Sequence, residues 1–295
     1  MNARVVLLTL FLCANQIIGT VPAGAVPLNA PSRFKYAGGT VPAWKAGTEQ
    51  PPENGTYSVT WKYPVFFDEN ESPRQKLNSW IRTVALTALF QGDDQLLQQA
   101  TALTDTHVLE ILGRDKKVRE AAAEQAELVP TNVFGPYVLF TLYTEWIGAA
   151  RPQHGIEHLV FDYGKGTSVP VQSLFKSNAK DVFSSLLRSA VEASFREKDP
   201  AYTACLQRKS LDAKVTCERE LNDDDIEACA NERSFDWHLL SIEGAQKVAI
   251  TFPYAPGWRK TCGDEVYVLE GEPVQQLFVE PGNFRKGRIP DRVTP

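Results

Sequence analysis

Two periodicities alternate along this chain, and their order limits the folds that it can adopt. Between Tyr57 and Tyr63 apolar and polar residues alternate, which is typical of a strand with one buried face. Ser72 and Pro73 then form a capping box with proline at the first helical position. The helix that they open has one apolar side, made of Leu77, Trp80, Ile81, Val84, Ala88 and Leu89. This order predicts a helix packed on a sheet.

The rest of the chain continues the mixture. A second helical region is expected over residues 93–128, interrupted near Gly113 and rich in charge and alanine in its second half. From residue 133 onward strands dominate, with amphipathic helices at 178–195 and 273–278. The expected strands are 137–146, 159–163, 167–171, 235–242, 247–252 and 265–269. The sequence predicts an α+β fold in which helices pack on a mostly antiparallel sheet.

The two ends of the chain show weaker patterns. Residues 1–25 resemble a secretory signal peptide, because Arg4 precedes an apolar run and small residues at 23–25 form a cleavage site. An uncleaved anchor is the alternative, but the apolar run is short for a membrane span. Residues 26–56, rich in proline and glycine, predict a flexible linker, and residues 279–295 a polar tail. We expect a periplasmic or secreted protein with no stable membrane span after signal cleavage.

Export to an oxidising compartment predicts that the cysteines form disulfides. Four remain after cleavage, Cys205, Cys217, Cys229 and Cys262, an even number in an oxidising compartment. Two disulfides are expected within an insertion in the fold, and Cys205 with Cys217 and Cys229 with Cys262 is one of three possible connectivities. A zinc site is disfavoured because the ligands of closed sites come in close pairs, whereas these cysteines are 11, 11 and 32 residues apart.

Composition excludes several classes of function. A net charge of −5 gives no basic footprint for nucleic acid. The chain carries no phosphate-binding loop, dinucleotide fingerprint or nucleophile elbow. No cofactor is expected.

Several short motifs follow one another in a recognisable order between residues 57 and 278. They are Lys76-Leu77-Asn78, Tyr143-Thr144, FDYGKG at 161–166, VQSLF at 171–175, Ile242-Glu243-Gly244, Phe252-Pro253-Tyr254 and VQQL at 274–277. Their order resembles that of the RsiV-like ectodomain family, the lysozyme-binding ectodomain of a bacterial anti-sigma factor that is also appended to peptidoglycan deacetylases. The resemblance implies one α+β domain, with parts at 57–132 and 133–278. It also implies a lysozyme-like protein or peptidoglycan as partner.

The candidate binding residues lie near the end of the strand at 137–146. Here the family has a compact Gly-Gly-Ala-His-Pro loop, whereas this chain has a longer loop at 148–155 that contains Arg151 and His154. Residues displayed at strand ends and loops often bind ligands, and arginine and aromatic residues often anchor protein interfaces. The candidates are Tyr143, Glu145, Arg151 and His154, with Tyr254 and Trp258 in a second loop. The alternative is that Tyr143 and Trp146 fill the core, which is the interpretation preferred for Trp146.

One segment of the sequence matches a catalytic motif. Residues 154–158 match the pattern H-x-x-E-H, in which a helix places two histidines on one face around zinc and a glutamate beside the metal-bound water. Here Gly155 lies inside the motif and strand-like residues follow, so a loop leading into a strand is expected instead.

The sequence thus predicts a non-catalytic binding module of the bacterial cell envelope that recognises a lysozyme-like protein or peptidoglycan. One alternative is a zinc-dependent envelope hydrolase that uses His154, Glu157 and His158. Another is a structural envelope protein without a ligand.

Overall fold

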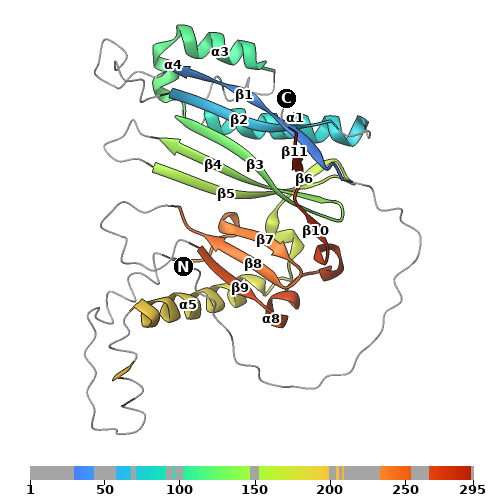
Figure 1. Cartoon of the computed structure of the whole chain (residues 1–295), viewed down its shortest axis with the longest axis vertical. Coiled ribbons are helices and arrows are strands. Elements are labelled where there is room, and N and C mark those ends of the chain that lie inside the picture. The colour runs from blue at the N-terminus through green and yellow to red at the C-terminus, as the bar shows by residue number, and fades with distance from the viewer. Residues whose placement is uncertain are drawn as a thin grey trace.

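The computed structural model describes residues 30–42, 58–67, 71–90, 96, 102–146, 153–198, 204–205, 208, 233–253 and 266–293. It confirms the α+β class, with helices packed on a large mixed sheet and on a small antiparallel sheet. Figure 1 shows the large sheet in the upper half of the molecule and the small sheet in the lower half. No helix in these ranges is both long and apolar enough to span a membrane.

The large sheet has eight strands in the order β11-β1-β2-β3-β4-β5-β6, with β10 paired to β3. Only the pairs β1 with β11 and β2 with β3 run parallel, so the expected antiparallel character is confirmed. The strands are β1 (Arg33–Pro42), β2 (Ser58–Phe66), β3 (Gln125–Phe134), β4 (Tyr137–Trp146), β5 (Gln153–Asp162), β6 (Thr167–Val169), β10 (Gly287–Arg288) and β11 (Asp291–Arg292).

Helix α1 (Glu71–Leu89) packs on one face of this sheet through the predicted apolar side. Leu77, Ile81 and Leu89 are fully buried. The side chain of Asn78 accepts a hydrogen bond from the Phe66 backbone N–H (2.9 Å) and donates one to the Phe66 carbonyl (2.8 Å), which fixes the helix against the end of β2. The helix begins at Glu71, so Ser72 lies inside it and not at the N-cap that the sequence predicted.

The second helical region is shorter than predicted. It contains α3 (Asp105–Arg114) and α4 (Lys116–Ala121), which meet at Asp115, close to the predicted break. The Asp115 side chain accepts hydrogen bonds from the backbone N–H groups of residues 117 and 118 and so starts the second helix. The prediction of helix up to residue 128 is wrong, because β3 begins at Gln125. There Ala126 pairs with Trp61 of β2, where a small buried side chain fits beside a large one.

The lower half forms around the small sheet of β7 (Leu240–Gly244), β8 (Lys247–Thr251) and β9 (Val266–Glu270). Helix α5 (Ala179–Lys198) packs on it through Phe183, Leu187 and Val191, and α8 (Glu272–Gln275) follows β9. Two 3₁₀ turns, η1 (Val171–Leu174) and η2 (Trp237–Leu239), join the halves. Residues 235–239 are therefore not a strand as predicted. Phe235 and Trp237 are apolar because they pack on the rings of Phe175 and Phe183.

The predicted linker at 26–56 contains strand β1, which pairs with β2 along its whole length. The glycines that suggested a linker have a packing role. Gly38 has a φ of 128°, and a Cβ at this position would lie 2.0 Å from the Trp61 carbonyl oxygen. Only glycine allows β1 to approach β2 so closely.

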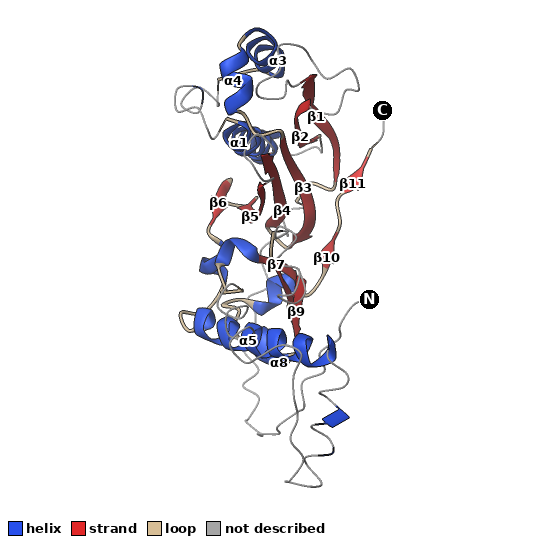
Figure 2. Cartoon of the chain, turned by 90° about the vertical axis from the view of Figure 1, so that its left-hand side faces the viewer, coloured by secondary structure: helices blue, strands red, loops and turns tan. Residues whose placement is uncertain are grey.

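The predicted polar tail is also part of the fold. Phe284, in the turn η4 (Pro281–Phe284), is 2% exposed and stacks on Tyr137 with ring centroids 5.5 Å apart. Beyond it, β10 and β11 pair with the large sheet through their backbone while their side chains face solvent, which explains the polar sequence. Figure 2 shows both strands on the side of the sheet away from α1. The predicted domain limits at 57 and 278 are therefore too narrow, whereas the proposed signal peptide lies outside the described residues.

Candidate binding site

Three of the six predicted binding residues meet on one face of the β4–β5 hairpin. Tyr143 and Glu145 lie on the same face of β4, and the register of the sheet places Ile156 and His154 of β5 opposite them. The Glu145 carboxylate is 3.6 Å from Nδ1 of His154. Tyr143 is 42% exposed, so the alternative that it fills the core is wrong. We call Tyr143, Glu145, His154 and Ile156 the Tyr143 patch.

The Tyr143 patch borders a small hollow of about 270 Å³ between the two sheets. Gln125 of β3 forms one side, and Thr251, Phe252 and Val266, at the ends of β8 and β9, form the other. The hollow therefore joins residues from five strands, which belong to both sheets. The remaining predicted residues, Arg151, Tyr254 and Trp258, lie outside the described residues, although Tyr254 follows Phe252 by two positions.

The H-x-x-E-H segment lies entirely within strand β5, which begins at Gln153, so the predicted absence of a helix is confirmed but the predicted loop is already strand. Four residues of strand separate His154 from His158 by about 13 Å, too far for both to bind one zinc ion. The side chain of Glu157 points to the opposite face. The arrangement on which the zinc hydrolase hypothesis depended is therefore not formed by this segment.

His158 lies on the same face as His154, where the turn η2 packs on β5. It is 8% exposed, and its Nδ1 is 2.9 Å from the hydroxyl of Thr141, which is also buried. Burial, and to a smaller extent the neighbouring His238, lowers the pKa of His158 to about 4. The Nε2 atom is buried without a hydrogen-bond partner among the described residues. His158 is therefore a buried, neutral histidine that is hydrogen-bonded to Thr141.

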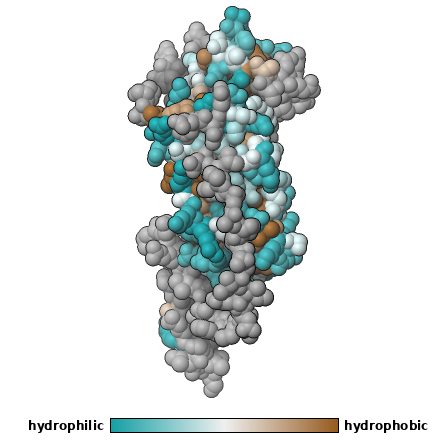
Figure 3. All heavy atoms as spheres, turned by 90° about the vertical axis from the view of Figure 1, so that its right-hand side faces the viewer, coloured by the Kyte–Doolittle hydropathy of each residue, from teal (hydrophilic) through white to brown (hydrophobic). Residues whose placement is uncertain are grey.

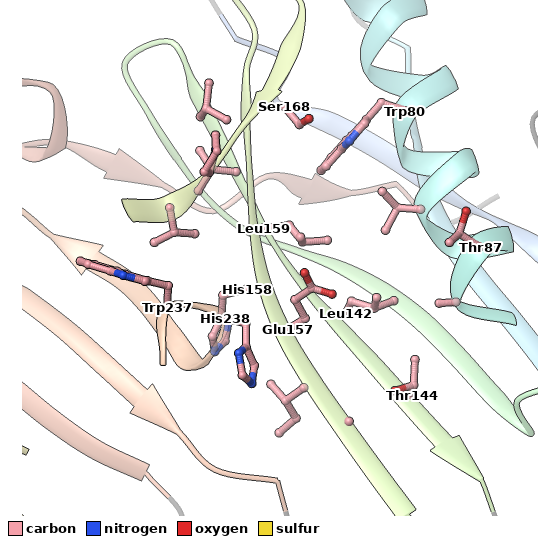
Figure 4. Close-up of a pocket in the computed structure, with 18 of the residues that line it drawn as sticks. Trp80, Thr87, Leu142, Thr144, Glu157, His158, Leu159, Ser168, Trp237 and His238 are labelled. Atoms are coloured by element: carbon pink, nitrogen blue, oxygen red, sulfur yellow. The ribbon is translucent and has the colours of Figure 1, made fainter. Parts of the chain in front are cut away.

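A larger groove, of about 1120 Å³, lies beside β5 (Figure 4). Trp80 and Thr87 of α1 form one wall, and Trp237 and His238 of η2 form the other. Figure 4 shows Glu157 on the side of β5 that faces α1, with His158 and His238 on the other side. The groove thus follows the strand between a helix of the upper half and a turn of the lower half.

Trp146, predicted as core, is half-buried and lines this groove. The sequence interpretation missed Trp80, Trp237 and Glu157 as groove residues. Trp80 had been placed correctly on the apolar side of α1, and it contacts the rings of Phe140 and Phe161. The apolar periodicity of α1 gives no indication that the Trp80 side chain also borders an open groove.

The disulfide prediction stays a prediction. Cys205 is disulfide-bonded, but Cys217, Cys229 and Cys262 lie outside the described residues, and neither predicted pair is confirmed. Within the described ranges, no group of three or more histidine, cysteine, aspartate or glutamate side chains is placed to hold a metal ion.

Two solved structures are similar to this chain. A DUF3298 family protein from Pseudomonas aeruginosa PAO1 has 15% sequence identity and a TM-score of 0.46, over 88% of this chain and 99% of that chain. A member of the DUF3298 family from Bacteroides fragilis NCTC 9343 has 13% identity and a TM-score of 0.44, over 86% of this chain and 98% of that chain. No family model matches the sequence, and no curated protein does. The structural neighbours of the chain are therefore DUF3298 family proteins.

Proposed function

We propose that this chain is an exported, non-catalytic binding module of the bacterial cell envelope, with a lysozyme-like protein or peptidoglycan as its ligand. The observation that carries the proposal is the Tyr143 patch. An exposed tyrosine, a carboxylate and an imidazole lie together at the rim of a hollow between two sheets.

The composition of the patch supports recognition of a protein surface. Tyrosine contributes a large contact area together with a hydroxyl group, and it is enriched at interfaces for this reason. Glu145 places a negative charge in the patch, and the chain as a whole has a net charge of −5, which favours a basic partner. The resemblance of the motifs to the RsiV-like ectodomain supports a lysozyme-like protein as that partner, with peptidoglycan as the second candidate.

The exposed surface supports a local site over a broad apolar interface. On the face drawn in Figure 3, the described hydrophobic residues form separate spots within a mostly hydrophilic surface. Large contiguous apolar patches mark obligate interfaces, so a partner that binds the described part of this face is expected to bind through a small mixed patch.

The test is capture of a purified c-type lysozyme by the immobilised full chain, with sedimentation of purified peptidoglycan as a parallel assay. Tyr143→Ala combined with Glu145→Ala should weaken binding of the true ligand by at least about tenfold, because interface tyrosines are frequent hot spots. Glu243→Ala is the matched control, since this acid is also partly exposed and paired, 3.0 Å from Lys247 on the small sheet. Binding of neither ligand, or equal binding by both variants, would reject the proposal.

A further inference from the structure

The outer edge of β5 is covered over only part of its length. Strand β6 pairs with it at Val160, Phe161 and Asp162, and then ends at Val169. Pro170, which lacks an N–H group, follows and leads the chain away into η1. No other described segment pairs with the outer edge of β5 between Gln153 and Leu159.

Hydrogen bonds at the β5–β6 turn show which backbone groups face this edge. Gly166 donates its N–H to the carbonyl of Asp162 (2.8 Å), so the backbone groups of Asp162 face β6. Tyr163 donates to the carbonyl of Pro136 (2.7 Å), at the start of β4, so its own groups face the other way. Because this direction alternates along a strand, Ile156 and His158 present N–H and C=O to the open edge. Such groups are a template for another strand.

The groove beside β5 lies where a strand paired with this open edge would be. Six consecutive residues, 155–160, line it, so the edge of β5 and not one face alone borders the space. The end of β6 and the residues after it, 168–172, line it as well. The groove therefore continues the path of β6, between the walls formed by Trp80 and Trp237.

The side chains along the edge define the chemistry of an occupant. Glu157 is exposed, and apart from two histidines it is the only ionisable side chain among the described residues that line the groove. Gly155, two residues away on the same face, has no side chain, and a Cβ at this position would lie 2.3 Å from the hydroxyl oxygen of Thr144 and 3.7 Å from the ring of Trp146. A cation opposite Glu157 and a large apolar side chain opposite Gly155 would complement this edge.

We propose that β5 binds an extended segment of a partner protein as an added antiparallel strand, in line with β6. The segment has the pattern Lys or Arg, any residue, then an aromatic or large aliphatic residue, read from the N-terminus. Its first residue lies opposite Glu157, its second pairs through the backbone with Ile156, and its third lies opposite Gly155, next to Trp146. This mode of binding shares the backbone of Ile156 with the Tyr143 patch, but it does not use the side chains of Tyr143, Glu145 or His154 and does not depend on the identity of the ligand proposed there.

The probe is the peptide acetyl-TKVFT-amide, titrated into the full chain by isothermal titration calorimetry. Methylation of the valine nitrogen removes the N–H that pairs with the Ile156 carbonyl and should weaken binding by at least about tenfold. Methylation of the lysine nitrogen, whose N–H points away from β5, is the matched control and should change affinity less than about threefold. The reversed peptide acetyl-TFVKT-amide should bind more weakly than the parent.

Substitutions in the protein test the same contacts that the altered peptides test. Glu157→Gln should weaken binding of the parent peptide by about fivefold to tenfold, because a charge-assisted hydrogen bond is lost. Glu243→Gln should leave the affinity for this peptide unchanged. Ile156→Pro removes an outward N–H without removing a bond to β4 and should abolish binding. Tyr143→Ala should leave peptide binding unchanged, so failure of the proposed function and failure of this inference can be told apart.

Three results would overturn the inference. One is absence of binding by the parent peptide at millimolar concentration, and another is equal binding by the two N-methylated peptides. The third is a dimer of the chain that Ile156→Pro dissociates, because a second copy would then occupy the edge. If Ile156→Pro does not fold, the two N-methylated peptides still decide the question with the unaltered chain.

Discussion

The two ends of one face of the β4–β5 hairpin have opposite environments. At one end Leu139, Thr141, His158 and Val160 are buried where the second half of the molecule packs on the sheet. At the other end the Tyr143 patch continues the same alternation of residues but remains partly exposed. The hairpin is regular throughout, with an unbroken register of ten pairs. What separates a core position from an exposed candidate binding position here is the extent of the layer that covers the sheet.

The largest contrast should appear in stability. Leu139→Ala should lower the free energy of unfolding by about 2–5 kcal/mol, because it leaves a cavity in a closely packed core. Tyr143→Ala, on the same face, should change it by less than about 0.5 kcal/mol. Urea denaturation of both variants measures the difference. Similar losses would mean that the exposed end of the hairpin is structurally coupled to the buried end.

The next contrast is pH dependence at the buried end. Because the pKa of His158 is about 4 in the folded chain and about 6.5 when unfolded, the unfolded state binds more protons between these values. The neutral histidine therefore contributes stability that is fully present above pH 6.5 and decreases as the pH falls toward 4, by about 3 kcal/mol in total. Urea midpoints at pH 7.5 and 4.5 test this. His158→Gln should reduce the pH dependence, and an unchanged dependence would contradict the assignment to His158.

A smaller effect on stability, with a clear effect on binding, is expected at the exposed end. Arg151→Ala combined with His154→Ala should weaken capture of a lysozyme-like protein and leave the thermal unfolding midpoint nearly unchanged. Differential scanning fluorimetry and the capture assay measure the two quantities on the same samples. Unchanged capture with a lower midpoint would assign a structural role to these residues and direct the search to Tyr254 and Trp258.

The smallest effect is expected from the pair of Glu145 and His154. Their atoms are 3.6 Å apart and both side chains are partly exposed, so water and salt screen the interaction. A double-mutant cycle with Glu145→Gln and His154→Ala should give a coupling energy below about 0.5 kcal/mol at physiological salt. A larger coupling would show that the Tyr143 patch is held in place as rigidly as the core beside it.

Periodicity predicted the elements that pack in the ordinary way. Strand β4 has the predicted bounds, and α1 and α5 bury the predicted sides, because one apolar face in contact with a core leaves a regular pattern. Strand β1 and the C-terminal strands were missed because they are held by backbone pairing and by a glycine that must lie close to Trp61. Their side chains carry little pattern of their own.

The site was predicted less completely than the fold. Tyr143, Glu145 and His154 were chosen as candidates because they lie near a strand end, and the register of the sheet places them together. The groove could not be predicted, since it depends on where Pro170 ends β6 and on Trp80 and Trp237, which are 157 positions apart in the sequence. A single alternating strand also gives no indication that its buried histidine lies under a second layer.

The parallel pairing of β1 with β11 has a mechanical consequence. Residues near the two ends of the described chain are joined here, with Asp291 and Val293 donating to the carbonyls of Ser32 and Phe34 (2.6 and 2.9 Å). When the two ends are pulled apart, parallel strands slide along each other, so these bonds share the load and do not open one by one. Deletion of residues 289–295 should therefore lower the unfolding force in a single-molecule pulling experiment, and an unchanged force would contradict this. Because β1 and β11 are joined in parallel, a force applied to the two ends of the fold acts on these hydrogen bonds before it reaches the core.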